Sequence, residues 1–347
     1  MKKSFMYFFI VLCFCFSYET AYAQEENNEN QELVNKIEEL EKRLNELTEE
    51  SRARRKLQIT EEEKQEKDKE VLEAVSREYT LDPKHSFSLD YTLSYGYTPS
   101  ERITNQLIID RTSDHTIEHT ISTSYSVLDN MAISSRFPFV YRYNELGTDE
   151  ELDETDIGDI SLGLAVQPFK SSAGKVTTTL NLGATLPTGR SPYKINPETE
   201  LSTGNGVYSF SATGSFSKQI DPVVAFWNLG YSYIMNAQGL DHQVAENIIL
   251  EKVEQGDKIS LGAGLAYALS YKVSVNASFS YSYTKSSSYF YKNVSQPFKS
   301  GDQTSATMSL GMGWSVSQMT TLSFSAGYSL TGSGFTFTFR APFNFIL

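Results

Sequence analysis

The sequence predicts an all-β transmembrane barrel of about twelve antiparallel strands with an N-terminal α-helical coiled-coil segment. Three observations predict this fold: an apolar leader for export, twelve segments in which apolar and polar residues alternate, and connectors that are long and short in turn. The mean hydropathy of −0.35 resembles that of a soluble domain. A membrane barrel also averages to such a value, because every second residue of a strand faces its polar lumen.

The leader has the three parts of a cleavable signal peptide. Two lysines precede an almost wholly apolar run, residues 5–16, and the small-x-small segment 21–23 provides the cleavage site. The run has about a dozen residues, whereas a spanning helix needs about 20. We therefore expect residues 1–23 to be removed. Both cysteines, Cys13 and Cys15, lie in this leader, so the mature protein is expected to have no thiol, disulfide or lipid anchor.

Residues 24–58 are predicted to form a periplasmic coiled-coil segment. Charged and polar residues dominate it, and its apolar residues recur four and three apart, the spacing of a heptad seam. The clean seam covers only about two and a half heptads, which is marginal for an isolated coil. Because attached barrels would hold such coils close together, we predict a homo-oligomer; a lone surface helix or a disordered acidic spacer is the alternative. The seam residues are Leu33, Ile37, Leu40, Leu44 and Leu47.

A linker helix is predicted within residues 59–84, where Val71, Leu72 and Val75 form a short apolar stripe before Pro83. The charge balance of the chain argues against a nucleic-acid partner. The whole chain carries −13, and removal of the leader, with two lysines and one glutamate, leaves −14. A phosphate backbone would be repelled by this acidic protein.

Residues 85–347 are expected to form the barrel. In the run 86–97, Phe, Leu and Tyr occupy every second position and alternate with small polar residues, which gives a strand one apolar face. About 12 residues at 3.3 Å each, tilted by about 40°, rise roughly 30 Å and can cross the apolar band of an outer membrane. The predicted spans are 86–98, 115–126, 131–143, 157–169, 176–187, 207–217, 223–234, 257–269, 273–284, 304–316, 321–331 and 335–346.

The connectors orient the barrel. Short ones, such as 128–130 and 221–222, alternate with long ones, and only 332–334 breaks the alternation. Since barrels of this class have short periplasmic turns and longer outer loops, both ends of the barrel are expected in the periplasm. Aromatic residues gather at opposite ends of upward and downward strands, as the two girdles of a membrane barrel do. We therefore expect the outer membrane of a Gram-negative bacterium, with its lipid as a partner.

Charged residues on the predicted lumen face are the candidate selectivity residues: Asp90, Glu118, Arg136 and Arg142. They could bind or select passing polar cargo, or they could be mutually neutralising pairs. Their neighbours on that face are mostly small and hydroxylated, and twelve strands enclose more space than side chains fill. A narrow polar pore is therefore expected.

Other chemistry-bearing residues give weaker signals. Asp149, Glu151, Asp153 and Asp156 crowd one loop and could offer oxygen ligands to calcium, although a solvated acidic loop has the same composition. We expect no metal site, no cofactor and no enzyme activity. A phospholipase would need a His and a Ser on the outer wall, and His119 on the predicted lipid face is its one possible start.

Three segments resemble the outer-membrane family named after the meta-pathway of phenol degradation: VLDNM at 127–131, GDISLGL at 158–164 and LPTGR at 186–190. This resemblance implies a barrel whose relatives are presumed transporters. The layout of coil, linker helix and twelve-strand barrel is also similar to that of the functional-amyloid exporter of pseudomonads. That second likeness implies a trimer, a coil that gates the pore or recruits cargo, and a plug made from the helix near 61–78.

The function expected from these patterns is an outer-membrane channel, a passive conduit for small solutes or for a secreted polypeptide, gated or oligomerised by the periplasmic helices. A non-transporting structural or adhesive barrel is the alternative, with partners bound by the long loops 188–206, 235–256 and 285–303. An outer-membrane phospholipase is the more distant one. The residues contain no code for the cargo or for the direction of transport.

Overall fold

The computed structural model describes residues 36, 38–50, 81–103, 109–146, 150–169, 175–196, 199–220, 223–245, 248–270, 272–317 and 320–346. The chain divides into two compact units, residues 1–65 and 66–347. The predicted leader, residues 59–80 of the predicted linker helix, and Leu33 and Ile37 of the seam lie outside the described residues.

The described part of the first unit is helical, at residues 36 and 38–50. Leu40, Leu44 and Leu47 of the predicted seam are 64%, 68% and 65% exposed, so this apolar stripe is uncovered in the single chain. The helix agrees with the sequence, whereas its assembly into a coiled coil stays a prediction. No helix within the described ranges is long and apolar enough to cross a membrane.

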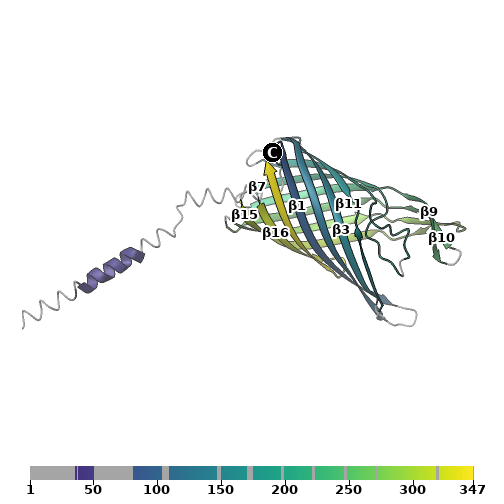
Figure 1. The fold of residues 1–347 in the computed structure, drawn as a ribbon, viewed down its shortest axis with the longest axis horizontal. Helices are drawn as coiled ribbons and strands as arrows, with labels where there is room; N and C mark the ends of the chain where they lie inside the picture. The colour runs from purple at the N-terminus through teal and green to yellow at the C-terminus, as the bar shows by residue number, and fades with distance from the viewer. Residues whose placement is uncertain are drawn as a thin grey trace, which may run out of the picture. The chain divides into compact units, whose positions relative to one another are not determined.

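Twelve antiparallel strands of the second unit close into a barrel (Figure 1). Closure occurs where β1 (Ser86–Ile103) pairs with β17 (Phe335–Ile346). We call the edge with the connectors after β2, β5, β7, β11 and β15 the turn rim, and the opposite edge the loop rim. The other ten strands are β2 (Ile109–Leu128), β3 (Met131–Leu146), β5 (Ser161–Val166), β6 (Thr177–Thr185), β7 (Ser209–Ile220), β8 (Val223–Ile234), β11 (Lys258–Ala268), β12 (Val273–Thr284), β15 (Gln303–Ser317) and β16 (Thr320–Ser329).

The predicted number of strands is confirmed, and β8, β12 and β17 have the predicted bounds. The fourth strand differs. Residues 161–166 form β5, and a separate strand, β4 (Glu150–Ile157), continues the pairing along the half of β3 nearer the loop rim. The sequence predicted a loop for most of β4 because acidic residues give it no apolar face. Such a face is not needed where a hairpin extends past the membrane into water.

A second, four-stranded sheet stands at the loop rim, where long loops were expected. It consists of β9 (Ala237–Ala245), β10 (Ile248–Glu254), β13 (Ser288–Tyr291) and β14 (Phe298–Lys299) in the order β14–β13–β10–β9. We call it the loop sheet. Its strands are short and its pairing around β10 shifts register twice, which explains why alternation along the chain did not reveal it.

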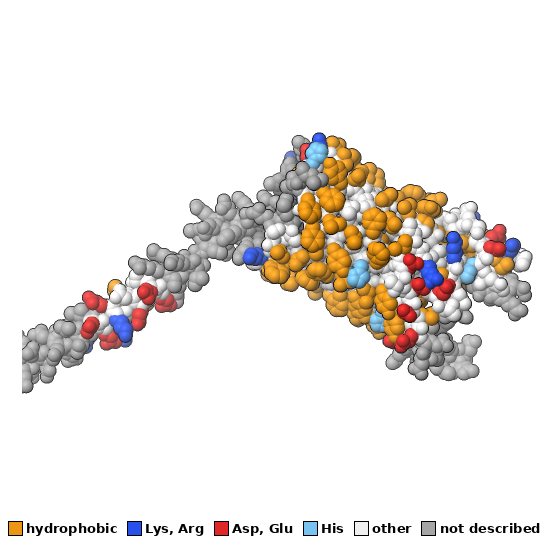
Figure 2. Space-filling model, viewed as in Figure 1, with side chains coloured by type: hydrophobic (Ala, Val, Ile, Leu, Met, Phe, Trp, Pro, Cys, Tyr) orange, Lys and Arg blue, Asp and Glu red, His pale blue; other side chains and the backbone are white. Residues whose placement is uncertain are grey.

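The barrel wall has two different faces. Large apolar side chains point outward and stay exposed, such as Leu261 at 47% and Phe279 at 46%, and Figure 2 shows them as an orange band around the visible wall. Charged side chains gather at the loop rim in the same view. An exposed apolar surface of this extent is stable only against lipid. The barrel therefore spans a membrane.

The two faces can be tested with neighbouring residues of β12. Phe279→Arg places a charge in the lipid and should destabilise the barrel by about 2–4 kcal/mol in bilayers. Ser280→Arg, one position along and facing the lumen, should change stability little. Equilibrium unfolding in vesicles measures both, and equal losses for the two variants would contradict this assignment of the faces.

Candidate functional site

Small side chains line the lumen between β12 and β15. Asn276 and Ser274 lie over Gly311 and Gly313 of the neighbouring strand, and a Cβ at either glycine would come within 2.6 Å of the Asn276 or Ser274 side-chain oxygen. The wall is therefore thin here, and each polar side chain lies along it. Apolar residues that are buried on the described barrel strands are few and mostly small, so they form no central hydrophobic core.

Charged residues on the inner wall form cross-strand pairs. Arg340 donates to Asp90 at 3.2 Å, and Arg136 donates to Glu118. Arg142 donates to Asp114 on β2. The four candidate residues, Asp90, Glu118, Arg136 and Arg142, thus all face the lumen, and each has an opposite charge beside it.

Two of these partners, Asp114 and Arg340, were not singled out in the sequence. Each sits diagonally across the strand pairing from its partner: Asp114 is opposite Asn144 rather than Arg142, and Arg340 is opposite Thr92 rather than Asp90. Only the register brings such residues together. The interpretation of these charged residues as mutually neutralising pairs therefore describes their local geometry. A role of these residues in selectivity stays a prediction.

The connector between β6 and β7, residues 186–208, folds against the inner wall; we call it the inner loop. Its two arms cross at Gly189 and Gly204, where a Cβ on Gly189 would lie 2.8 Å from the Gly204 Cα. The backbone N–H groups of Thr203 and Gly204 both donate to the Arg190 carbonyl, at 3.2 and 3.1 Å. Only glycine permits this close approach. The crossing gives the inner loop a narrow neck.

Asp159 holds the neck from the barrel side. Its carboxylate accepts hydrogen bonds from the backbone N–H groups of Gly189 at 3.1 Å and Asn205 at 2.6 Å, one from each arm. The Thr188 hydroxyl donates to the Gly158 carbonyl at 2.7 Å and accepts from the Ile160 N–H at 2.9 Å. The segments GDISLGL and LPTGR, distant in sequence, are thus physically joined.

A second set of contacts ties the inner loop to β3 and β4. Arg142 of β3 donates to the Ser202 carbonyl at 2.8 Å, and Arg190 pairs with Glu154 of β4 and also with Glu200 of the inner loop itself. A polar hollow of about 460 Å³ remains between the loop and the wall. Glu118, Arg136, Arg142 and Asp159 all line it, so three of the four candidate residues meet at one place.

The outer side of the inner loop packs on the loop sheet. Tyr193 and Val207 join a buried apolar cluster with Leu240, Leu250 and Val253, and Val253 is fully buried. Gln255 donates a hydrogen bond to the Tyr193 hydroxyl, and burial raises the pKa of this phenol to about 12. The inner loop lies between the barrel wall and the loop sheet, and both hold it.

Two Tyr–Asp hydrogen bonds anchor the loop sheet to the barrel. Tyr231 donates to Asp257 at 2.7 Å and Tyr283 donates to Asp302 at 2.6 Å, which ties each long loop back to the strand where it began. The Tyr283 hydroxyl and the Ser286 N–H lower the pKa of Asp302 below its ordinary value of 3.8.

The residues considered for metal binding and catalysis do not converge. Alternation along β4 puts Glu151 and Asp153 on one face and Asp156 on the other, and Asp149 lies outside the described residues. Within the described ranges, no group of three His, Cys, Asp or Glu residues is placed to hold a metal ion. His119 bonds the Tyr91 hydroxyl through Nδ1 at 2.8 Å, and among the described residues it forms no hydrogen bond to a serine.

A model of the family described as "Putative MetA-pathway of phenol degradation" matches residues 110–345, more than half of the chain. The chain belongs to this family. The match confirms the resemblance carried by the three segments at 127–131, 158–164 and 186–190, which all lie within it. Two of these segments are those that Asp159 and Thr188 join, so this family's sequence pattern coincides with the neck of the inner loop.

Several solved structures are similar to this one. An outer membrane channel from Pseudomonas putida F1 matches with a TM-score of 0.58 and 11% identity, over 78% of this chain and 98% of that chain. The transport unit of the autotransporter AIDA-I from Escherichia coli (TM-score 0.45, 9% identity) covers 80% of this chain and 97% of its own. A mutant of the monoaromatic hydrocarbon channel TodX (TM-score 0.45, 9% identity) covers 77% and 91%. The first of these likenesses establishes the fold, a closed barrel of the outer-membrane type.

Asp159→Ala should release the inner loop. Each hydrogen bond to a charged group contributes about 1.5–3 kcal/mol, and both arms lose one. We expect faster hydrogen exchange at the amides of Gly189 and Asn205 in the folded protein, with the strands unchanged. Ser161→Ala, also lining the hollow, is the control. Unchanged exchange at both amides in Asp159→Ala would show that the carboxylate does not hold the neck.

Acid should loosen the base of the long loop 285–303. Because the folded-state pKa of Asp302 is lowered, its contribution to stability is fully present above 3.8 and is lost as pH falls below that value. Limited proteolysis within 285–303 between pH 6 and pH 3 measures this. Asp302→Asn should show the acid pattern already at pH 6. Cleavage that is equally slow in both proteins at pH 6 would contradict the assignment.

Proposed function

We propose that this protein is a passive channel for small polar solutes in the outer membrane of a Gram-negative bacterium. The observation that carries the proposal is the lumen: twelve strands close around a wall of Ser, Thr, Asn and Gly with paired charges, and among the described residues apolar side chains do not fill the interior. A barrel of this size without such filling leaves room for water. Paired opposite charges on one wall create a local electric field. A polar solute can interact with this field, whereas an apolar solute gains no favourable interaction from it.

The inner loop favours small solutes over a secreted polypeptide as cargo. Asp159 fixes the inner loop at its neck, Arg142 fixes it to β3, and Tyr193 fixes its outer side to the loop sheet. The inner loop is therefore a preformed part of the structure that narrows the opening of the lumen, which we call the mouth. An unfolded chain would have to displace all three attachments. A solute that fits beside the loop needs none of them to break.

The remaining parts of the proposal concern orientation and assembly. The turn rim faces the periplasm, because it carries the short connectors and both ends of the barrel. The segment 24–58 then lies in the periplasm, after removal of residues 1–23. The exposed leucine stripe at Leu40, Leu44 and Leu47 supports an oligomerising role for this segment, with gating of the pore as its consequence.

An adhesive or structural barrel is the second candidate, favoured by the ordered loop sheet at the loop rim. Two of the three long loops contribute to that sheet, whereas the third, the inner loop, turns inward and is less available to a partner. A deletion strain separates the candidates. Loss of solute uptake with normal surface attachment supports the channel, and the opposite result supports the adhesin.

Shortening the inner loop should raise conductance. Replacing residues 191–203 with a Gly-Ser linker removes side chains that narrow the opening of the lumen, so single-channel conductance in planar bilayers should rise several-fold over that of the unaltered protein. A matched replacement of residues 288–299 in the loop sheet should change it much less. Absence of any conductance in the unaltered protein and in the shortened variant would exclude the channel.

A further inference from the structure

The outward face of the barrel is apolar at mid-height except along β1, β2 and β3. There, Tyr91, His119, Thr123 and Ser135 point outward, and we call them the polar strip. On β11, β12 and β16 the corresponding positions hold Ile, Leu, Val, Ala and Phe, with tyrosines only near the ends. Figure 2 shows histidine atoms within the orange band on this side of the barrel. The polar strip is thus a local exception on an outward face that is otherwise apolar at mid-height.

Tyr91 and His119 of the polar strip lie in the middle of the apolar band, and Thr123 and Ser135 lie one outward position from the row of Phe87 and Tyr125. Along the β1–β2 pairing the polar strip sits between Phe87 opposite Tyr125 near the turn rim and Tyr97 opposite His115 near the loop rim. Its members bond each other: Tyr91 with His119 at 2.8 Å, and Thr123 Oγ1 with Ser135 Oγ at 2.7 Å. The Nε2 atom of His119 has no hydrogen-bond partner among the described residues, and the imidazole is exposed.

Contact with lipid hydrocarbon is unfavourable for the polar groups of this strip. An imidazole nitrogen or hydroxyl without a partner in lipid costs free energy, and ionisable residues at this depth usually face protein or water. Contacts between protein surfaces inside membranes, by contrast, are enriched in small residues and in Ser, Thr and His, which can bond across the contact. The polar strip therefore suits a protein neighbour better than lipid.

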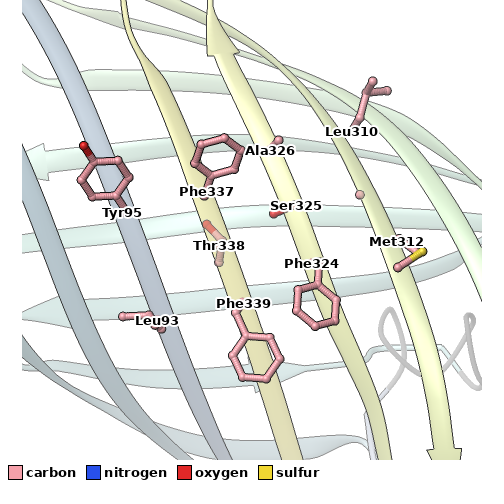
Figure 3. Close-up of a pocket in the computed structure, with 11 residues that line it drawn as sticks. Leu93, Tyr95, Leu310, Met312, Phe324, Ser325, Ala326, Phe337, Thr338 and Phe339 are labelled. Atoms are coloured by element: carbon pink, nitrogen blue, oxygen red, sulfur yellow. The ribbon is translucent and has the colours of Figure 1, made fainter.

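An apolar hollow adjoins the polar strip. Figure 3 shows it on the outer wall across β15, β16, β17 and β1, with Ala326 between Phe337 and Leu310. Its volume is about 510 Å³. Leu93, at its edge, pairs directly with His119 of the strip. Strip and hollow together form one continuous surface, from β15 through β1 to β3, which we call the β15–β3 face.

We propose that the β15–β3 face is the contact between copies of this chain within the membrane. A second copy is the partner that the chain itself indicates, because the helix at 38–50 has a separate uncovered stripe, Leu40, Leu44 and Leu47, of the kind that a like helix covers. Symmetric homo-oligomers are also the commonest assemblies. The hollow accepts a protruding side chain such as Phe139, which is 52% exposed, from the neighbouring copy. This contact goes beyond the channel function and does not depend on it.

The first test makes the polar strip apolar. We expect the mature wild-type protein in mild detergent to have a mass of two or more chains by light scattering, and His119→Leu/Thr123→Val/Ser135→Val to have the mass of one. Ala263→Val/Ala277→Val, on β11 and β12 away from the β15–β3 face, should keep the wild-type mass. The heat-dependent gel shift of a folded barrel shows that each variant is folded.

The outcomes are unambiguous. A monomeric wild type overturns the proposal, and so does a triple variant that keeps the wild-type mass, because the segment 24–58 or another face would then hold the copies together. Dissociation by the triple variant alone supports it.

The second test locates the contact in isolated outer membranes. Ser135→Cys, Thr123→Cys and Ala326→Cys, alone and co-expressed in pairs, should give a crosslinked dimer with a short bismaleimide, whereas Ala277→Cys should not. The native cysteines lie only in the leader. An oligomeric protein that crosslinks at Ala277→Cys and at none of the three face positions would place the contact elsewhere.

Discussion

Closure of the sheet by pairing β1 with β17 is the constraint on which the rest of the structure depends. Inside a bilayer every backbone N–H and C=O must find a partner within the protein, and an open edge strand would leave a row of them unpaired. Twelve residue pairs, Ser86–Ile346 to Tyr97–Phe335, complete this pairing between the two ends of the barrel. Once the ring is closed, side chains have only two directions to point, and lipid and water impose opposite chemistry on the two faces.

The inner face, which contacts water, consists of small side chains and of charged residues that neutralise one another locally. Serine, threonine and glycine keep the wall thin, while diagonal pairs such as Arg142–Asp114 allow charge without leaving an unpaired ion beside the protein's low dielectric. Asp159 differs from these because backbone N–H groups, rather than a cation, satisfy its carboxylate. Asp159, in the short connector between β4 and β5, thereby supports the inner loop and couples the start of β5 to the position of that loop.

The outer face meets the opposite requirement almost everywhere, and its exceptions are therefore informative. The polar strip on β1–β3 and the hollow around Ala326 lie side by side, on the same wall that closes the barrel. Neither feature is favourable on a wall that faces lipid. In a contact between copies, the polar strip supplies directional hydrogen bonds and the hollow supplies shape complementarity. The same physical rule that identified the lumen by its polarity thus identifies a second surface.

Periodicity along the chain determined the number of strands, the face that each residue takes and the lumen position of Asp90, Glu118, Arg136 and Arg142, because alternation is a local property of extended chain. The sequence also determined the family, through three short segments. It could not show that two of those segments meet at the neck of the inner loop, that Arg340 lies beside Asp90 across 250 residues of chain, or that 235–256 and 285–303 build a sheet. Register between strands and the path of the loops decide these contacts. Both depend on how distant parts of the chain pack together, and only the tertiary structure contains that information.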